Sequence, residues 1–414
     1  MTTFISLSGM LLLLLFAYLV SFNRRAVSWR TVLLAFALQF SLGAIALYFS
    51  AGRAALESIS ATVTKVLSYG QVGIDFMFGE IGQFKLGFVF AFHVLPVVIF
   101  FSSLVAVLYY LGIMGWVIRV LGGGLRALLG TSRAESMSAT ANIFVSQTEA
   151  PLVVRPYVAG MTRSELFAVM VGGMATVAGS VLAGYVALGV EMKYLIAASF
   201  MAAPGGLLMA KLLYPETEQP LDSDEAYQIE KDNYSNVIDA AAGGASNGLQ
   251  LAVNIGAMLI AFVALIALLN GILSWLGGLG GYEGLSLQEI FGWLFSPIAY
   301  FLGVPWHEAS VAGSLIGQKL VLNEFVAFVD FAAQKESLSA HTQAVVSFAL
   351  CGFANFSSIA ILLGGLATIA PSRRSDVANL GLRAVAAAFM ANLMSAAIAG
   401  FFLSIALPTG SPIG

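Results

Sequence analysis

Two short polar segments, Gln147-Thr148-Glu149-Ala150-Pro151 and Asn323-Glu324, interrupt a chain that is otherwise strongly apolar. Each carries one carboxylate and is flanked by apolar, glycine-rich sequence typical of membrane-embedded protein. An ionisable group at membrane depth is costly, and such groups usually belong to functional sites. Two of them at corresponding places in two halves of a chain indicate a binding site at the bilayer midplane of a secondary transporter.

The composition agrees with a membrane protein. Of the 414 residues, 59% are hydrophobic and only 10% are charged, whereas a soluble domain carries roughly 25% charged residues. The net charge of −3 gives no reason to expect a nucleic acid partner, and the lipid bilayer is the expected surrounding. The single cysteine, Cys351, cannot form an intramolecular disulfide, so we expect it to be a small packing residue.

A membrane helix needs about 20 apolar residues, and the apolar runs predict eight spans. We expect Pro204-Gly205-Gly206 to break or kink the fifth span. In residues 52–68 the apolar side chains fall on one face, which predicts an amphipathic helix at the outer interface. The predicted spans cover residues 4–22, 31–50, 86–118, 165–189, 193–213, 248–275, 343–370 and 377–406.

The arginines predict the orientation. They cluster near residues 24–30, 119–133 and 373–374, in connections that span counting places on the same side. The positive-inside rule makes that side cytoplasmic, so both termini are expected outside. No basic residue precedes the first apolar run and no cleavage site follows it, which favours a true span over a signal peptide.

Residues 121–160 and 286–328 are too irregular for plain spans, because they are rich in glycine and polar side chains. Non-helical backbone at membrane depth is tolerated only where protein or a water-filled cavity surrounds it. We therefore predict two re-entrant helical hairpins that enter from opposite sides. The first has its tip at residues 146–151, with Pro151 in the first turn of its second arm. The predicted fold is an all-α integral membrane protein with eight transmembrane helices and an inverted repeat.

The hairpin tips suggest the kind of ligand. Gln147, Thr148 and Glu149 offer donors and acceptors together, which suits a neutral polar ligand, and neither tip holds the Arg or Lys that would favour an anion. Carbonyls freed at a hairpin tip, with the oxygens of Asn142 and Thr176, suit a monovalent cation such as sodium. Ordinary helix capping explains an Asn and a Thr equally well.

Enzyme-like strings in this sequence lack their context. His307-Glu308 begins an H-E-x-x-H string, but Val311 stands where the second His belongs. No Walker loop occurs either, so we expect no catalytic residues and no cofactor. Two alternatives to sodium coupling stay open: a proton-coupled transporter in which Glu149 or Glu324 titrates, and, more remotely, an intramembrane enzyme that uses both carboxylates. The two closed hairpins disfavour a passive channel.

Four segments together resemble one known family. They are Ser132-Arg133-Ala134-Glu135-Ser136, the run from Gln147 to Leu152, the run from Asn323 to Ala327, and Cys351-Gly352-Phe353-Ala354-Asn355. They look like the concentrative nucleoside transporters, in particular the bacterial, eight-span, sodium-coupled members, and the resemblance covers nearly the whole chain.

The resemblance implies a homotrimeric symporter of the bacterial inner membrane that imports uridine-like nucleosides with sodium by an elevator movement. Scaffold helices would lie in residues 1–120 and 248–285. The transport domain would comprise residues 121–213 and 286–414, and residues 214–247 would form an acidic cytoplasmic loop.

The resemblance also assigns roles to individual residues. Thr176 stands where a bacterial member of the family has serine, and it keeps the hydroxyl. The implied nucleobase contacts are Gln147, Thr148 and Glu149, with Val181 lining the base pocket; the ribose contacts are Glu324, Asn355 and Ser358, with Phe353 against the sugar; and the sodium ligands are Asn142, Val145, Thr176 and Val177.

Overall fold

The fold was analysed in a computed structural model that describes residues 2–83, 85, 88–220, 234–282 and 284–406. Within these ranges every regular element is a helix, which confirms the predicted all-α class. Seven of the eight predicted spans are helices long and apolar enough to cross a membrane. They are α1 (Thr2–Leu19), α2 (Trp29–Leu47), α4 with α5 (Phe90–His93 and Leu95–Tyr110), α9 with α10 (Arg163–Ala175 and Gly179–Ala187), α11 (Met192–Leu213), α12 (Val237–Leu279) and α18 (Arg374–Ala406).

The third span is shorter than predicted. It ends at Tyr110, because Gly112 adopts a left-handed conformation with φ of +77° that turns the chain. Of the arginines expected at the end of this span, Arg119 and Arg126 lie on a separate helix, α6 (Ile113–Leu129), and Arg133 begins the helix after it. The predicted amphipathic helix is α3 (Ser50–Phe78), which is longer than residues 52–68.

Both irregular regions contain a helical hairpin. The first consists of α7 (Arg133–Ala141), a non-helical tip, a 3₁₀ turn (Ala150–Val154) and α8 (Arg155–Val158), and Pro151 lies in the first turn after the tip as predicted. The second consists of α14 (Trp306–Val321) and α15 (Glu324–Gln334). An additional helix, α13 (Leu287–Phe301), precedes α14 and is bent from it by 114°.

Two spans that we predicted as continuous are broken near their middle. The fourth leaves helical geometry between α9 and α10, where Thr176 is extended. The seventh is split into α16 (Ala340–Leu350) and α17 (Ser357–Ile369). Backbone groups freed at such breaks must find partners inside the protein, and the next subsection shows where they go.

The fifth span was predicted to be broken or kinked at Pro204-Gly205-Gly206, and of these two the break is wrong. Helix α11 is continuous through Pro204. The glycines that follow allow close packing instead: a Cβ at Gly205 would collide with Gln39 of α2, and one at Gly206 would lie 3.5 Å from the Cα of Gly172. The weakening of the helix by proline is therefore offset by contacts on both sides of it.

The acidic connection is shorter than expected. Residues 221–233 of the predicted loop lie outside the described residues, and α12 already begins at Val237 rather than near residue 248. Asn236 caps this helix through bonds of 2.9 Å from the amides of Ile238 and Asp239.

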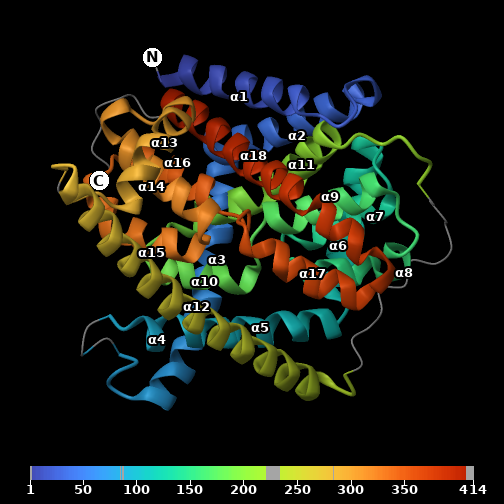
Figure 1. Cartoon of the computed structure of the whole chain (residues 1–414). Coiled ribbons are helices and arrows are strands. Elements are labelled where there is room, and N and C mark those ends of the chain that lie inside the picture. The colour runs from blue at the N-terminus through green and yellow to red at the C-terminus, as the bar shows by residue number, and fades with distance from the viewer. Residues whose placement is uncertain (1, 84, 86–87, 221–233, 283, 407–414) are drawn as a thin grey trace.

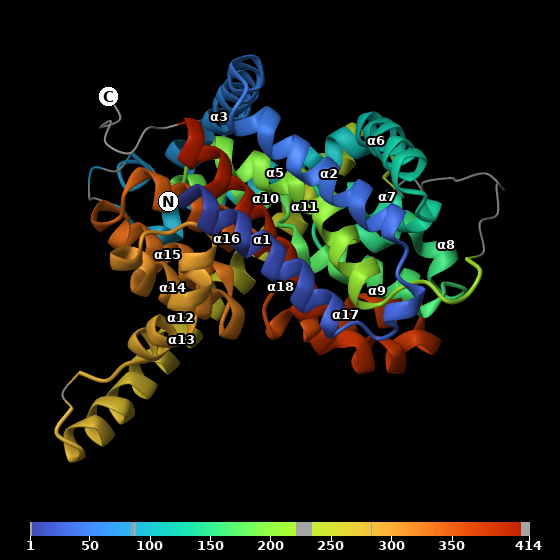
Figure 2. The same cartoon turned by 90° about the horizontal axis from the view of Figure 1, so that it is seen from above.

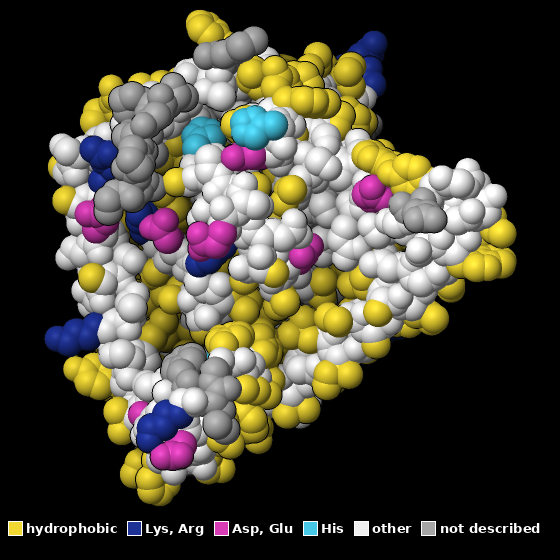
Figure 3. Space-filling model, turned by 90° about the vertical axis from the view of Figure 1, so that its left-hand side faces the viewer, with side chains coloured by type: hydrophobic (Ala, Val, Ile, Leu, Met, Phe, Trp, Pro, Cys, Tyr) yellow, Lys and Arg dark blue, Asp and Glu magenta, His cyan; other side chains and the backbone are white. Residues whose placement is uncertain are grey.

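The helices form a compact body with two helices along one side. Figure 1 shows α1 lying across α18 at the top, the hairpins and broken spans in the middle, and α5 beside α12 at the bottom. From above, α12 projects away from the body (Figure 2). Large apolar side chains are exposed on outer helices, including Phe76 of α3 and Ile260 of α12, and hydrophobic side chains spread over the face in Figure 3. Such a surface fits a lipid environment.

Candidate functional site

The two halves of the chain build the same local arrangement around their breaks. In the first half, the amide of Gly179, at the start of α10, donates to the carbonyl of Phe144 in the first hairpin tip, at 3.1 Å. In the second half, the amide of Phe356, just before α17, donates to the carbonyl of Leu320 at the end of α14, at 3.3 Å. The two pairs are separated by nearly the same interval along the sequence. Each hairpin is thus bonded to the broken span of its own repeat, as expected of the inverted repeat.

The hairpin tips and breaks, with α5 and α12, line a cavity of about 290 Å³ into which many polar residues are gathered. All eight residues expected to contact a substrate line it, so the structure brings together side chains that lie far apart in the sequence. They are Gln147, Thr148, Glu149, Val181, Glu324, Phe353, Asn355 and Ser358. A cavity slightly below the usual size range of small-molecule sites fits a compact polar ligand.

The first hairpin tip presents an amide and a carboxylate with different surroundings. Gln147 is buried, and its Nε2 donates to Ser358 Oγ at 3.3 Å while its Oε1 has no partner. Glu149 is exposed, and its Oε2 accepts from the amide and hydroxyl of Ser146, both at 2.9 Å. The tip therefore holds one buried acceptor and one carboxylate oxygen, Oε1, that can bond a ligand.

Glu324 is the buried carboxylate of the site, with 4% of its surface exposed. It is the first residue of α15, where the helix dipole favours a negative charge, and Asn323 caps the same helix through the amide of Val326. Tyr185 donates to Oε1 at 3.2 Å and Asn355 donates to Oε2 at 3.1 Å. Each carboxylate oxygen keeps a lone pair for a further donor.

The break between α16 and α17 holds the remaining contacts in place. Ser358 Oγ donates to the carbonyl of Phe353 at 2.5 Å, and the amide of Ser358 donates to Asn355 Oδ1 at 3.0 Å. The amide of Phe353 donates to the carbonyl of Thr176 at 3.1 Å, which joins the two broken spans directly. The half-buried ring of Phe353 lines the cavity beside these polar groups.

The expected cation ligands also lie together, around Gly172 of α9. Asn142 is fully buried, and its Nδ2 donates to the carbonyl of Ser138 at 2.8 Å while its Oδ1 has no partner. Thr176 Oγ1 donates to the carbonyl of Gly172 at 3.0 Å, so its lone pairs stay available. A Cβ at Gly172 would lie 3.4 Å from Asn142 Nδ2. An unpartnered buried amide oxygen is costly, and a hard cation would satisfy it. Val145 and Val177 are buried on the same two segments as Asn142 and Thr176.

Tyr185, which donates to Glu324 from outside the cavity lining, and three residues that line the cavity escaped the sequence analysis. Tyr185 was missed because an isolated tyrosine in an apolar span gives no signal. Asn247, Gln250 and Asn254 on α12 recur at helical spacing and could have been recognised as a polar stripe. They line the cavity opposite the hairpins, so one wall of the site belongs to a different part of the fold.

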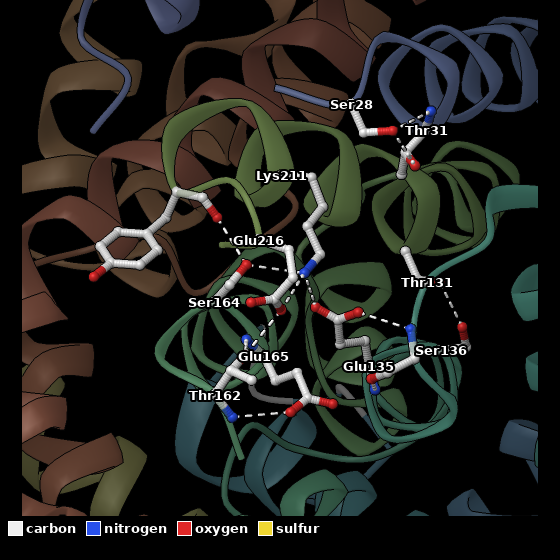
Figure 4. A network of polar contacts seen from close by, with 12 residues as sticks. Ser28, Thr31, Thr131, Glu135, Ser136, Thr162, Ser164, Glu165, Lys211 and Glu216 are labelled. Atoms are coloured by element: carbon white, nitrogen blue, oxygen red, sulfur yellow. Dashed lines mark hydrogen bonds and ion pairs between the residues drawn. The ribbon is translucent and has the colours of Figure 1, made fainter. Parts of the chain in front are cut away.

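A buried polar network anchors the first hairpin away from the cavity (Figure 4). Lys211 of α11 is paired with Glu135 of α7, donates to Ser164 Oγ at 2.9 Å and lies 3.5 Å from Glu216. Glu135 also closes a capping box with Ser132, by accepting from its amide at 2.9 Å. The network fixes the start of the hairpin to α9 and α11.

The architecture defines a class of protein before any relative is considered. Two opposed hairpins and two broken spans surround a polar cavity within an apolar, multi-pass helical body. This combination is characteristic of secondary transporters with inverted repeats.

Comparison with known proteins identifies the family. The model described as "Na+ dependent nucleoside transporter C-terminus" matches residues 194–400, its N-terminal counterpart matches residues 8–81, and a "Nucleoside recognition" gate model matches residues 91–192. The chain belongs to the Na+-dependent nucleoside transporter family, as the sequence motifs predicted.

Relatives and solved structures agree. The chain is 49% identical over 411 residues to the nucleoside permease NupC of Helicobacter pylori, with 97% of this chain and 98% of that protein covered. It is 42% identical to sodium/nucleoside cotransporter 1 of Mus musculus, covering 96% of this chain and 63% of the mouse protein. The structure of CNTnw in an inward-facing substrate-bound state matches all of both chains, with 56% identity and a TM-score of 0.95.

Proposed function

We propose that this protein imports uridine-like nucleosides together with sodium, and that the cavity between the two hairpins is where the nucleoside binds. The observation that carries the proposal is the meeting of Gln147, Glu324 and Asn355, from three separate segments, around one polar cavity. The sodium/nucleoside cotransporters among its relatives support the choice of ion and substrate.

The nucleoside would use the two sides of the cavity differently. A uracil edge carries both donors and acceptors, and Gln147, Thr148 and Glu149 offer both on one tip, with Val181 against the base. Ribose hydroxyls would donate to the free lone pairs of Glu324, because charge-assisted hydrogen bonds are the strong ones. Asn355 and Ser358 would complete the ribose contacts, with the ring of Phe353 packed on the sugar.

Sodium would bind at the root of the first hairpin tip. The unpartnered Oδ1 of Asn142, the hydroxyl of Thr176 and carbonyls near Val145 and Val177 supply neutral oxygens there. An ion held between the tip and the break would order Gln147 and its neighbours for the nucleoside. Coupling of this kind is reciprocal, so each ligand should raise the affinity for the other.

Movement across the membrane would follow the division of the cavity walls. The hairpins and broken spans carry the ligand contacts, while α12 contributes the opposite wall. We propose that the hairpins slide past α5 and α12 as an elevator, within a homotrimer in the bacterial inner membrane. Both termini would lie outside, since the arginines of α6 and of the segment after α17 then face the cytoplasm.

Uptake of labelled uridine into proteoliposomes tests the proposal. We expect accumulation above equilibrium with an inward sodium gradient, and none with matched potassium or choline gradients at fixed pH. Accumulation driven only by a proton gradient would move the coupling role to a carboxylate, with Glu324 the first candidate. Absence of uridine uptake under every gradient would contradict the assigned substrate.

A further inference from the structure

Lys319 is a buried cation that the proposed function does not use. It lies near the end of α14, the first arm of the second hairpin, and none of its surface is exposed. A lysine buried in the membrane-embedded part of a protein is costly unless fixed acceptors surround its ammonium group. The burial of Lys319 is therefore tolerable only if neighbouring groups compensate its ammonium group.

One partner of Lys319 is a carbonyl at the break of the seventh span, and the other is a side chain of α18. Its Nζ donates to the carbonyl of Ala349, in the last turn of α16, at 2.7 Å and to Asn392 Oδ1 at 2.6 Å. The ring centroid of Phe389 lies 5.9 Å from the same nitrogen, a distance at which a cation is attracted to the ring face. A positive charge at the carboxyl end of a helix is also favoured by the helix dipole.

Asn392 links the surroundings of Lys319 to the first repeat. Its Nδ2 donates to the carbonyl of Ala175, where α9 ends, at 2.6 Å, and to the carbonyl of Cys351 at 3.1 Å. The carboxyl ends of both half-helices, α9 and α16, therefore meet beside one asparagine of α18 and one ammonium group. A Cβ at Gly352 would collide with Asn392, so this close approach depends on that glycine.

The two repeats differ in the cation that compensates the carboxyl ends of their half-helices. The bonds from Gly179 to Phe144 and from Phe356 to Leu320 align the hairpins, and this alignment places Lys319 next to the counterpart of Asn142. In the first repeat the hairpin brings an unpartnered carbonyl, Asn142 Oδ1, and so needs a cation from solution. In the second repeat it brings an ammonium group of its own.

We propose that the ammonium group of Lys319 serves as a built-in cation. It holds the hairpin and the broken span of the second repeat together, as the coupling sodium ion would in the first repeat. It positions the α16–α17 break, and thereby Phe353 and Asn355, without occupying the ligand site. This inference rests on the proposed sodium and nucleoside sites and assigns a positioning role, not a contact with the substrate.

The test compares Lys319→Met with the wild type and with Lys193→Met, a control at a partly exposed lysine paired with Glu191. Uridine affinity is measured on the full-length protein by calorimetry. Sodium binding is measured separately, as the rise in unfolding temperature when sodium replaces choline without nucleoside. We expect Lys319→Met to bind uridine about a hundredfold more weakly and to keep its sodium-dependent rise, and Lys193→Met to match the wild type.

The outcomes separate a positioning role from general damage. Uridine affinity in Lys319→Met within about threefold of the wild type, or equal loss of the uridine and sodium responses, would overturn the proposal. If Lys319→Met does not fold, Lys319→Arg decides: a folded arginine variant that retains uridine binding supports a requirement for positive charge, and failure of both variants to fold overturns the ligand-coupled role. If sodium does not raise the unfolding temperature of the wild type, the proposed sodium site is contradicted instead. The uridine affinity of Lys319→Met then decides the role of Lys319 without the sodium measurement.

Discussion

Glu324 is a buried, ionisable group that its neighbours satisfy only in part, a combination that a membrane protein retains at functional sites. Its two protein donors, Tyr185 and Asn355, are neutral. When ionised, its remaining lone pairs can accept charge-assisted hydrogen bonds from the hydroxyl groups of a ligand.

The first prediction follows from the charge of Glu324. Glu324→Gln keeps the volume and the bond from Tyr185 but replaces one acceptor oxygen by a donor facing Asn355. We expect uridine binding to weaken about a hundredfold and uptake to vanish while the protein still folds, as measured by calorimetry and proteoliposome uptake. Glu191→Gln, at an exposed position before α11, is the control. Uridine uptake by Glu324→Gln at the wild-type rate would contradict the proposed contact between Glu324 and the ribose.

The hydroxyl of Thr176 supports a second prediction. Thr176→Val keeps the β-branched shape and removes one proposed sodium ligand, so the sodium concentration for half-maximal uridine uptake should rise about tenfold. Thr176→Ser should stay near the wild type. Thr368 of α17 makes the same bond to the fourth preceding carbonyl, at 2.7 Å, on an exposed surface, so Thr368→Val is a matched control. An unchanged sodium dependence in Thr176→Val would remove this residue from the ion site.

At the scale of elements, the first hairpin begins at a buried ion pair. Glu135 and Lys211 have side chains that are 1% and 8% exposed, and they join α7 to α11. The same carboxylate caps α7, so hairpin geometry and charge pairing depend on one residue.

The third prediction concerns this pair. Lys211→Met leaves Glu135 buried without its cation, and breaking such a pair costs about 3 kcal/mol or more. We expect a clear drop in unfolding temperature in detergent, whereas Lys85→Met, which removes an exposed pair with Glu80, should change it little. An unfolding temperature for Lys211→Met equal to that of the Lys85 variant would show that the network does not stabilise the hairpin.

The sequence predicted elements whose signal is local and missed those that depend on distant partners. Apolar length located the spans, and the polar segments located both hairpins, including the turn at Pro151. The breaks at Thr176 and Cys351 were not foreseen, because the freed carbonyls are satisfied by Asn392, far along the chain. The break predicted at Pro204 is absent for a similar reason, since packing against α2 and α9, which are distant in the sequence, keeps α11 helical. Propensity is a weak prior wherever tertiary contacts decide.

The candidate site shows the same limit. Its residue types could be listed from motifs, but only the fold explains why Glu149 is exposed while Glu324 is buried. The wall supplied by Asn247, Gln250 and Asn254 belongs to α12, a helix whose apolar character hides its polar stripe.

At the scale of the whole molecule, the packing bears on which helices move together. Helices α1 and α2 are both joined to α18, in the second repeat, by polar contacts. Thr3 and Ser404 hydroxyls are 2.7 Å apart, and Gln39 donates to Ser395 at 2.9 Å. By contrast, α5 meets α10 through apolar side chains, with Val94 3.0 Å from a Cβ built on Gly184. Apolar contacts without directional bonds are easier to slide than hydrogen-bonded ones.

The fourth prediction uses cysteine pairs to locate the sliding boundary. We expect a Thr3→Cys/Ser404→Cys cross-link to preserve uridine uptake, because α1 then travels with α18. A Ser103→Cys/Ala241→Cys cross-link, within the α5–α12 pair joined by a 2.8 Å bond, should also preserve it. A Val94→Cys/Gly184→Cys cross-link should abolish uptake until it is reduced. Each pair is built in a Cys351→Ala background, since Cys351 is the native cysteine.

The three cross-links distinguish two divisions of the molecule. The sequence analysis placed the first two spans in a fixed scaffold, whereas their polar contacts with α18 favour a moving body that includes them. If the α1–α18 cross-link stops uptake as fully as the α5–α10 cross-link, the stationary scaffold contains all four of the predicted scaffold spans. These are α1, α2, α4 with α5, and α12. If only the α5–α10 cross-link stops it, the stationary part reduces to α5, α12 and the helices attached to them. The nucleoside would then cross the membrane beside a single polar stripe, formed by Asn247, Gln250 and Asn254.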